Sequence, residues 1–253
     1  MVADCPVTGG RCQMPSIPKK WRGRGFRGKE IIERLPLWRA KGGQALCRVA
    51  VSPCFLCGVP VGTGSTLCAA CWASLPRYAE TRRRTLMGVG RVQVGFDYVY
   101  PVVSLIRALK FGQALYLAPT LAQVWREFPL PACLPDCVIP IPLSRQRWRR
   151  RGYNQALELA PPLAHWLHCP VQKGLVRLRA TLPQAELPRA ARQSNVVGAF
   201  RASAHLQGRQ VALVDDVLTT GSTLEAATAA LHQVGVGGVD VWVCAEAPVP
   251  DSF

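Results

Sequence analysis

The chain has 253 residues, of which 49% are hydrophobic, so it can bury one substantial core and still carry a small appendage. Its 31 Lys and Arg against 15 Asp and Glu give a net charge of +16, which favours polyanionic partners such as phosphorylated sugars or nucleic acid. The sequence has no run of about 18 apolar residues and no apolar signal segment at its start, which predicts a soluble, cytoplasmic protein without a membrane span.

The first predicted segment, residues 1–46, is a basic tail. Residues 1–50 hold 11 Lys and Arg against 3 Asp and Glu, which is half of the excess positive charge of the chain. High charge, several glycines and little apolar periodicity predict disorder for this segment. Arg-Gly stretches with interleaved aromatic residues also bind single-stranded nucleic acid. A translation start assigned too far upstream would explain such a tail equally well.

Residues 51–77 contain two Cys-x2-Cys pairs, Cys54 with Cys57 and Cys68 with Cys71. We expect each pair to lie on a tight turn, with the ten residues between the pairs folded back as a short hairpin. Either pair alone could be a redox site, but two pairs at this spacing favour a closed, structural metal site. Zinc is the expected metal, and iron is the alternative for the same ligands.

The rest of the chain alternates strand and helix patterns. We expect strands at 94–100, 137–143, 171–178, 196–201, 211–214 and 239–245, and helices at 102–110, 114–128, 154–167 and 223–233. Such alternation predicts an α/β domain with a mainly parallel sheet, which binds its ligands at the carboxyl ends of the strands.

An arginine-rich run follows the second of these strands. Arg145, Arg147 and Arg149 are typical of a solvated face. Arg151, followed by Gly152 and a helix start, instead places a guanidinium and free N–H groups where an anion could bind. Further along, residues 179–195 are polar and contain two prolines, which indicates either a loop that orders over a ligand or an ordinary surface loop.

The most informative segment is residues 211–223, in which an apolar strand is followed by Asp215 and Asp216 and then by a loop and a helix. The loop is predicted to bind a phosphate, because Gly221 permits close backbone approach and its neighbours supply hydroxyl groups: Thr219, Thr220, Ser222 and Thr223. The two acids could accept hydrogen bonds from the vicinal hydroxyls of a ribose.

Two other interpretations compete for this segment. Paired acids at a strand end also hold magnesium in response-regulator receivers, but only 37 residues follow Asp216, too few for the rest of a receiver. A structural turn with a Ser or Thr helix cap is the second alternative.

The segment resembles the PRPP-binding motif of type I phosphoribosyltransferases, where PRPP is phosphoribosyl pyrophosphate. Over about residues 50–246, the chain resembles the ComF/GntX family, in which a four-cysteine zinc module precedes a phosphoribosyltransferase-like domain. The resemblance rests on the four cysteines and on the segments 108–112, 138–143, 151–155, 183–184, 192–195 and 211–223.

The resemblance implies a phosphoribosyltransferase-like domain over residues 94–246. It also implies that Asp215 and Asp216 hold the ribose hydroxyls, that residues 219–223 hold the 5-phosphate, and that magnesium arrives with PRPP. A pyrophosphate-side loop would contain Ser144 and Arg145, with Arg151 and Asn154 nearby, and residues 184–195 would form the loop that covers the substrate. The family is associated with DNA uptake in natural competence.

The sequence identifies no nucleobase pocket and no residue placed to activate a nucleophile, so three hypotheses follow. The first is a transferase that binds PRPP, or a descendant that still binds it. The second is a competence component that binds single-stranded DNA and partner proteins. The third is a regulator that senses PRPP without turnover. The paired acids favour the first, because carboxylates repel a DNA backbone, whereas the basic tail and the arginine run favour the second.

Overall fold

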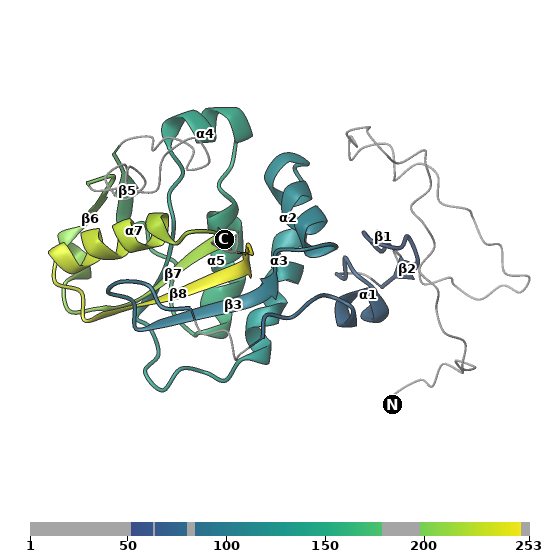
Figure 1. Ribbon diagram of the computed structural model, residues 1–253, viewed down its shortest axis with the longest axis horizontal. Coiled ribbons are helices and arrows are strands. Elements are labelled where there is room, and N and C mark those ends of the chain that lie inside the picture. Colours follow the sequence, from purple (N-terminus) through teal and green to yellow (C-terminus); the bar gives the residue numbers. More distant parts are fainter. Residues whose placement is uncertain (1–51, 63, 80–83, 179–197, 249–253) are drawn as a thin grey trace, which may run out of the picture. The chain divides into compact units, whose positions relative to one another are not determined.

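The computed structural model describes residues 52–62, 64–79, 84–178 and 198–248 (Figure 1). The basic tail predicted for residues 1–46 and the covering loop predicted for residues 184–195 lie outside these ranges. Contacts divide the chain into two units, residues 1–72 and residues 73–253, which we describe separately. The domain boundaries expected from the sequence, 51–77 for the four-cysteine module and 94–246 for the α/β domain, remain predictions.

The described part of the first unit contains two short strands, β1 (Ser52–Pro53) and β2 (Pro60–Val61), and the helix α1 (Ala69–Ala73), which ends one residue past the boundary. β1 and β2 pair antiparallel and enclose the first cysteine pair. The chain folds back within residues 58–67 as predicted, because the N–H of Ser65 donates to the carbonyl of Gly62 and the N–H of Phe55 donates to the carbonyl of Thr66. The strand pairing differs from the prediction: β2 pairs with β1, which precedes Cys54.

The second unit is built on a four-stranded sheet in the order β3-β8-β7-β4. All neighbouring strands are parallel, which confirms the predicted sheet. The strands are β3 (Arg91–Asp97), β4 (Cys137–Pro140), β7 (Gln210–Leu218) and β8 (Gly238–Glu246). Parallel pairing places all four carboxyl ends at one edge, so the residues after Pro140, around Leu218 and at Glu246 share one end of the sheet.

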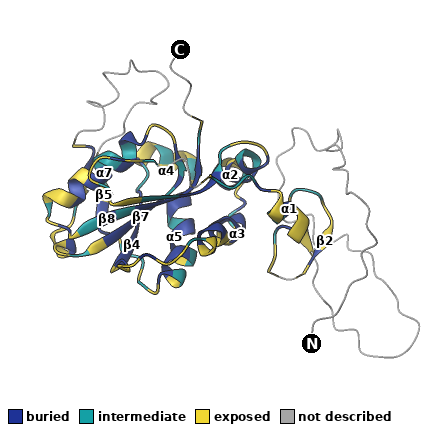
Figure 2. Cartoon of the chain, turned by 60° about the horizontal axis from the view of Figure 1, so that its bottom comes forward, coloured by how far each residue is buried: buried dark blue, intermediate teal, exposed yellow. Residues whose placement is uncertain are grey.

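Helices cover both faces of this sheet (Figure 1). On one face, α7 (Ser222–Gln233) packs its apolar side against alternate residues of the strands, such as Val211 and Leu213 of β7. On the other face lie α5 (Gln155–Trp166) and α3 (Leu117–Ala122), with α2 (Val102–Phe111) adjoining α3. Figure 2 shows how the buried residues concentrate in the strands and on the inner side of α5.

The single helix expected over residues 114–128 is shorter than predicted. α3 begins at Leu117, and the chain tightens into the 3-10 helix η3 (Gln123–Glu127). Trp125 on this turn is fully buried, and its indole N–H donates to the carbonyl of Val243 at 3.2 Å. Its ring also meets Trp242 edge-on, with centroids 6.4 Å apart. These contacts with β8 depend on the tertiary structure. They favour a 3-10 turn at η3, although the local sequence pattern predicts a continuous α-helix.

Two expected strands do not join the main sheet. β5 (Leu175–Arg177) and β6 (Phe200–Ala202) pair antiparallel as a separate two-stranded sheet. The strand predicted from residue 171 is interrupted: Val171 bridges to Val138, and the chain then leaves the sheet at Gly174. A Cβ at Gly174 would lie 2.5 Å from Leu206, whose own turn is the 3-10 helix η5 (Ala204–Leu206), so this close approach requires a glycine.

The arginine run is helical. Residues Arg145–Arg151 form α4, which starts at Ser144 and ends at Gly152 in the left-handed conformation with φ of 80°. Of the two residues predicted for the pyrophosphate-side loop, Ser144 lies before the helix in extended conformation, and Arg145 is the first residue of α4. The hydroxyl of Ser144 accepts from the N–H of Arg147 at 3.3 Å and satisfies the helix start, and Gly152 provides the stop.

Candidate functional site

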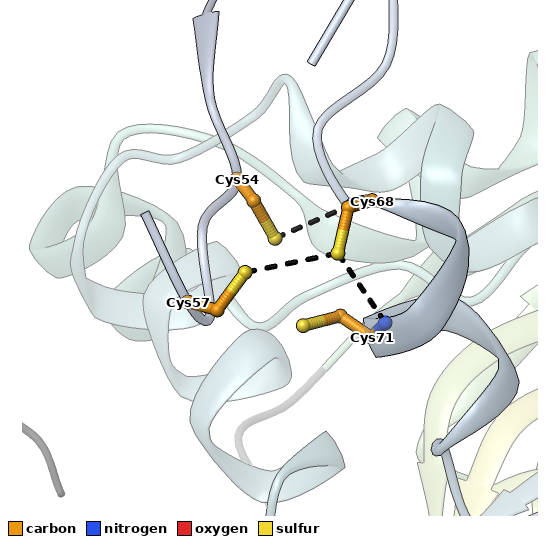
Figure 3. A group of neighbouring side chains, drawn as sticks. All are labelled: Cys54, Cys57, Cys68 and Cys71. Atoms are coloured by element: carbon orange, nitrogen blue, oxygen red, sulfur yellow. Dashed lines mark hydrogen bonds between the residues drawn. The ribbon is translucent and has the colours of Figure 1, made fainter. Parts of the chain in front are cut away.

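The four predicted metal ligands lie together in the first unit (Figure 3). The sulfur atoms of Cys54, Cys57, Cys68 and Cys71 are all within 4.8 Å of one another. Those of Cys57 and Cys68 are 3.7 Å apart. Cys54 and Cys71 are buried, and the other two are half-buried, so the thiols face one another in a closed cluster.

Backbone hydrogen bonds hold the first cysteine pair in its turn. The N–H of Gly58 donates to the carbonyl of Cys54 at 2.8 Å, and Gly58 has φ of +78°. Only a residue without a Cβ adopts this conformation readily, so a glycine directly after Cys57 suits this turn. The second pair differs from the prediction, because Cys71 lies within α1 instead of on a second tight turn.

Backbone N–H groups also point at the sulfurs. The N–H of Cys68 donates to Sγ of Cys54 at 3.3 Å, and the N–H of Cys71 donates to Sγ of Cys68 at 3.4 Å. Burial raises the pKa of the Cys54 thiol, but backbone N–H groups outweigh burial and lower it to about 6. Burial raises the pKa of the Cys71 thiol, and the neighbouring thiols raise it further. The cluster favours thiolate at one position, and four converging sulfurs could bind a metal such as zinc.

The second set of predicted residues lies at the carboxyl edge of the parallel sheet. The sequence analysis placed Asp215 and Asp216 after the apolar strand. In the structure, β7 continues to Leu218, so both acids lie inside the strand. Successive residues of a strand point to opposite faces, so the two carboxyl groups project away from each other. The strand extends because Asp215, Val217 and Leu218 keep their partners on β8.

The two acids have different partners. The carboxylate of Asp216, which is 7% exposed, forms an ion pair of 2.9 Å with the ammonium group of Lys110 in the last turn of α2. The half-buried Asp215 accepts from the N–H of Asp216 at 2.8 Å. Burial raises the pKa of Asp215 to about 7, and the charge of Asp216 adds to this effect; the N–H of Asp216, Lys110 and Arg177 oppose it.

Arg177 of β5 is a cation on the Asp215 side, and it was not predicted as a site residue from the sequence. Its guanidinium lies over the ring of Phe200, 5.2 Å from the centroid. Burial lowers the pKa of Arg177, the charge of Arg147 adds to this, and the charge of Asp215 opposes it. Arg177 therefore lies close enough to Asp215 to compensate part of its charge.

The 219–223 loop connects β7 to α7. Gly221 has φ of +88° and stands directly before Ser222, the first residue of α7. The hydroxyls of Thr220 and Ser222 are 3.0 Å apart. The first N–H groups of any helix have no partner within it, so this hydroxyl-lined turn at the start of α7 is suited to an anion.

The other predicted residues surround the neighbouring end of β4. Asn154 starts α5: its side-chain oxygen accepts from the N–H of Ala156, and its amide donates to the carbonyl of Ile141 at 2.9 Å. Ser144 starts α4 in the same way, so both residues are engaged in helix capping. Arg145 is exposed on α4. The structure brings Ser144 and Asn154 to the site edge but leaves Arg145 on the solvent face.

Arg151 is the predicted arginine that faces inward. Its guanidinium donates to the side-chain oxygen of Gln155 at 2.8 Å and lies 4.9 Å from the centroid of the Phe111 ring. Burial lowers the pKa of Arg151, while the charge of Asp216 opposes the shift. Nε of Arg151 and Nε2 of Gln155 are buried without a hydrogen-bond partner. Two such donors, of which Arg151 interacts with the charge of Asp216, are suited to a ligand that supplies acceptor oxygens.

The chain is similar to a known domain family and to several known proteins. The Phosphoribosyl transferase domain family matches residues 154–249. DNA utilization protein YhgH of Salmonella typhi is 36% identical over 203 residues, which cover 77% of this chain and 84% of that protein. The Escherichia coli K12 protein of the same name is 33% identical over 223 residues, 83% and 92% of the two chains. Competence protein F of Haemophilus influenzae is 34% identical over 195 residues, 71% and 84% of the two chains.

The chain belongs to the ComF/GntX family. Its α/β unit contains a type I phosphoribosyltransferase domain with a parallel sheet, as predicted. In the described ranges of this ComF/GntX protein, no helix is both long and apolar enough to cross a membrane.

Two cations near the acids, Lys110 and Arg177, were not predicted as site residues. Lys110 lies in the segment 108–112, which carries the family resemblance but was not assigned to the site. Arg177 ends a short apolar stretch and has no motif of its own. Only the pairing of β5 with β6, and the packing of α2, bring these cations to the acids.

Proposed function

We propose that the protein binds PRPP or a related ribose-phosphate at the carboxyl edge of its parallel sheet. The observation that carries this proposal is the combination of paired acids on β7 with a glycine turn at the start of α7. Cations on both sides of the acids, Lys110 and Arg177, favour a ligand that is itself anionic.

Each part of such a ligand has a counterpart in the site. The carboxylates of Asp215 and Asp216 would accept hydrogen bonds from the ribose hydroxyls. The N–H groups and hydroxyls of residues 219–223 would bind the 5-phosphate. The unpartnered donors of Arg151 and Gln155 are suited to the pyrophosphate oxygens. Magnesium would be held mainly by the oxygens of PRPP and would neutralise its charge.

In the first unit, we propose that the four cysteines hold a structural zinc ion. Four thiolates leave no open coordination position for a substrate, and so small a module has little apolar core of its own. The names of the relatives, DNA utilization protein and competence protein, support a role in DNA uptake, and we place the protein in the cytoplasm as part of this proposal. A ribose-phosphate site could serve that role as an enzyme or as a sensor of PRPP.

Calorimetric titration with Mg·PRPP, before and after replacing both acids, tests the ribose-phosphate site. In the variant with Asp215→Asn and Asp216→Asn, the shape is kept but the charge-assisted hydrogen bonds are lost, each worth about 1.5–3 kcal/mol. We expect the affinity for PRPP to fall about ten-fold to a few hundred-fold. The control is Asp240→Asn, which removes a half-buried carboxyl nearer the amino end of β8. Absent binding in the native protein, or an equal affinity in the double variant, would refute the proposal.

A second candidate function, single-stranded DNA binding, is favoured by α4. Arg145, Arg149 and Arg150 are exposed on this helix, and Trp148 among them is 48% exposed. Arginines with an exposed aromatic ring are suited to phosphates and stacked bases. We expect Trp148→Ala to weaken oligonucleotide binding about ten-fold and to leave PRPP affinity unchanged. Under the DNA hypothesis, the double Asn variant removes two negative charges, so its oligonucleotide affinity should hold or increase.

A further inference from the structure

A segment far from the 219–223 loop in sequence contacts it directly. Arg84 donates from Nη2 to the carbonyl of Thr220 at 3.2 Å, and the carbonyl of Thr219 lies 3.5 Å from the same nitrogen. Nη1 of Arg84 is 3.5 Å from the carboxylate of Glu246. Glu246 is the last residue of β8, is 7% exposed, and pairs in register with Leu218 of β7. Arg84 thus joins the loop to the carboxyl end of the neighbouring strand.

Peptide geometry gives these contacts a consequence for the ligand. In a planar trans peptide, the C=O and N–H groups point in opposite directions. When Arg84 binds the carbonyls of Thr219 and Thr220, the N–H groups of Thr220 and Gly221 are turned to the opposite side. The next N–H groups along the chain are those at the start of α7. Successive N–H groups on one side of a turn form a concave anion site.

Neighbours of Arg84 fix the same loop by other contacts. A Cβ at Gly221 would lie 2.4 Å from Cδ2 of Leu86, so Leu86 is packed closely against the glycine. The N–H of Met87 donates to the carboxylate of Glu225 in the first turn of α7 at 3.2 Å. Nε2 of His232, in the last turn of α7, is 2.7 Å from the carbonyl of Gly88. Residues 84–88, which we call the α7 strap, therefore hold the loop and both ends of α7.

We propose that Arg84, oriented by Glu246, is a positioning residue that sets the 219–223 loop in its phosphate-binding conformation. This inference rests on the proposed ribose-phosphate function and adds to it a residue outside the matched range 154–249. Arg84 acts through the loop carbonyls, on the side opposite the N–H groups that would meet the phosphate. It is therefore distinct from a residue that contacts the ligand.

The test combines hydrogen exchange with titration of full-length protein. In Arg84→Gln, we expect amides of residues 215–225 in the ligand-free protein to exchange at least about five-fold faster, because two loop carbonyls lose their charged donor. The affinity for ribose 5-phosphate should fall about ten-fold. Glu246→Gln should shift both quantities in the same direction by less. Arg126→Gln, which removes one exposed arginine on η3, should change neither.

Arg84→Lys separates positioning from charge. Lysine keeps the positive charge but cannot span two carbonyls and a carboxylate, so it should restore less than half of the lost affinity. Full restoration by lysine, or unchanged exchange in Arg84→Gln, would overturn the proposal. If the native protein binds neither PRPP nor ribose 5-phosphate, the proposed function fails, and the exchange of the loop amides still decides the role of Arg84. A lowered thermal transition with normal loop exchange would show that Arg84 only stabilises the fold, and would also overturn it.

Discussion

At the scale of single residues, the two adjacent acids of β7 have acquired different environments. Asp216 faces α2 and is compensated by Lys110, whereas Asp215 lies on the opposite face with a raised pKa. Carboxyl groups with perturbed pKa values, such as that of Asp215, cluster at functional sites. The two residues therefore make separate, measurable contributions.

The raised pKa of Asp215 makes stability dependent on pH. Its pKa is about 7 in the folded protein against 3.8 for a free aspartate side chain, so the folded state binds more protons between these values. The free energy of unfolding should therefore fall as pH rises from about 4 to 7. Asp215→Asn has no carboxyl to ionise in this buried position. The variant should therefore be more stable than the native protein by about 1–3 kcal/mol at pH 8, and equal to it near pH 4. Urea unfolding at both pH values measures the difference; a constant difference would contradict the assignment.

The ion pair between Lys110 and Asp216 predicts a coupling between helix α2 and strand β7. Lys110→Met leaves a buried carboxylate without its partner and should lower the free energy of unfolding by about 1–3 kcal/mol. In the Asp216→Asn background the same change should cost much less, because no charge remains to be compensated. Arg107→Met, on the exposed side of α2, is the control. Additive effects of the two changes in a double-mutant cycle would show that the pair contributes nothing.

At the scale of elements, the cysteine cluster joins β1, β2 and α1, which have few apolar residues to hold them. Cys57→Ser should release about one metal ion per chain and unfold the module, because metal binding and folding are coupled in such small units. Metal analysis and separate unfolding transitions measure this. Cys133→Ser, at an exposed cysteine, should retain the metal. If Cys57→Ser keeps its full metal content, the cluster is not the binding site.

At the scale of the whole molecule, the α/β unit contains the site and most of the buried residues. The composition of residues 1–46 cannot support a core, so their deletion should leave the thermal transition and PRPP affinity unchanged. Limited proteolysis should remove these residues first. The matched comparison is deletion of residues 1–77, which also removes the cysteines. A sharply lower transition after the shorter deletion would show that the tail belongs to the fold.

Much of the fold follows from local patterns. The apolar run before Asp215, the glycine turn and the following helix were predictable because each depends on neighbours in sequence. The parallel sheet was predictable from the alternation of strands and helices. The cysteine spacing likewise indicated the cluster, although it did not show that Cys71 would lie on a helix.

The tertiary structure decided what local patterns do not encode. The carboxylate of Asp216 meets Lys110, and the carbonyl of Thr220 meets Arg84 across 136 positions of the chain. β5 and β6 leave the main sheet and bring Arg177 to Asp215. Local spacing determines secondary structure and loop chemistry, because these depend on adjacent residues. Which cations surround the acids depends on how distant elements pack, and that packing is fixed only when the whole core forms.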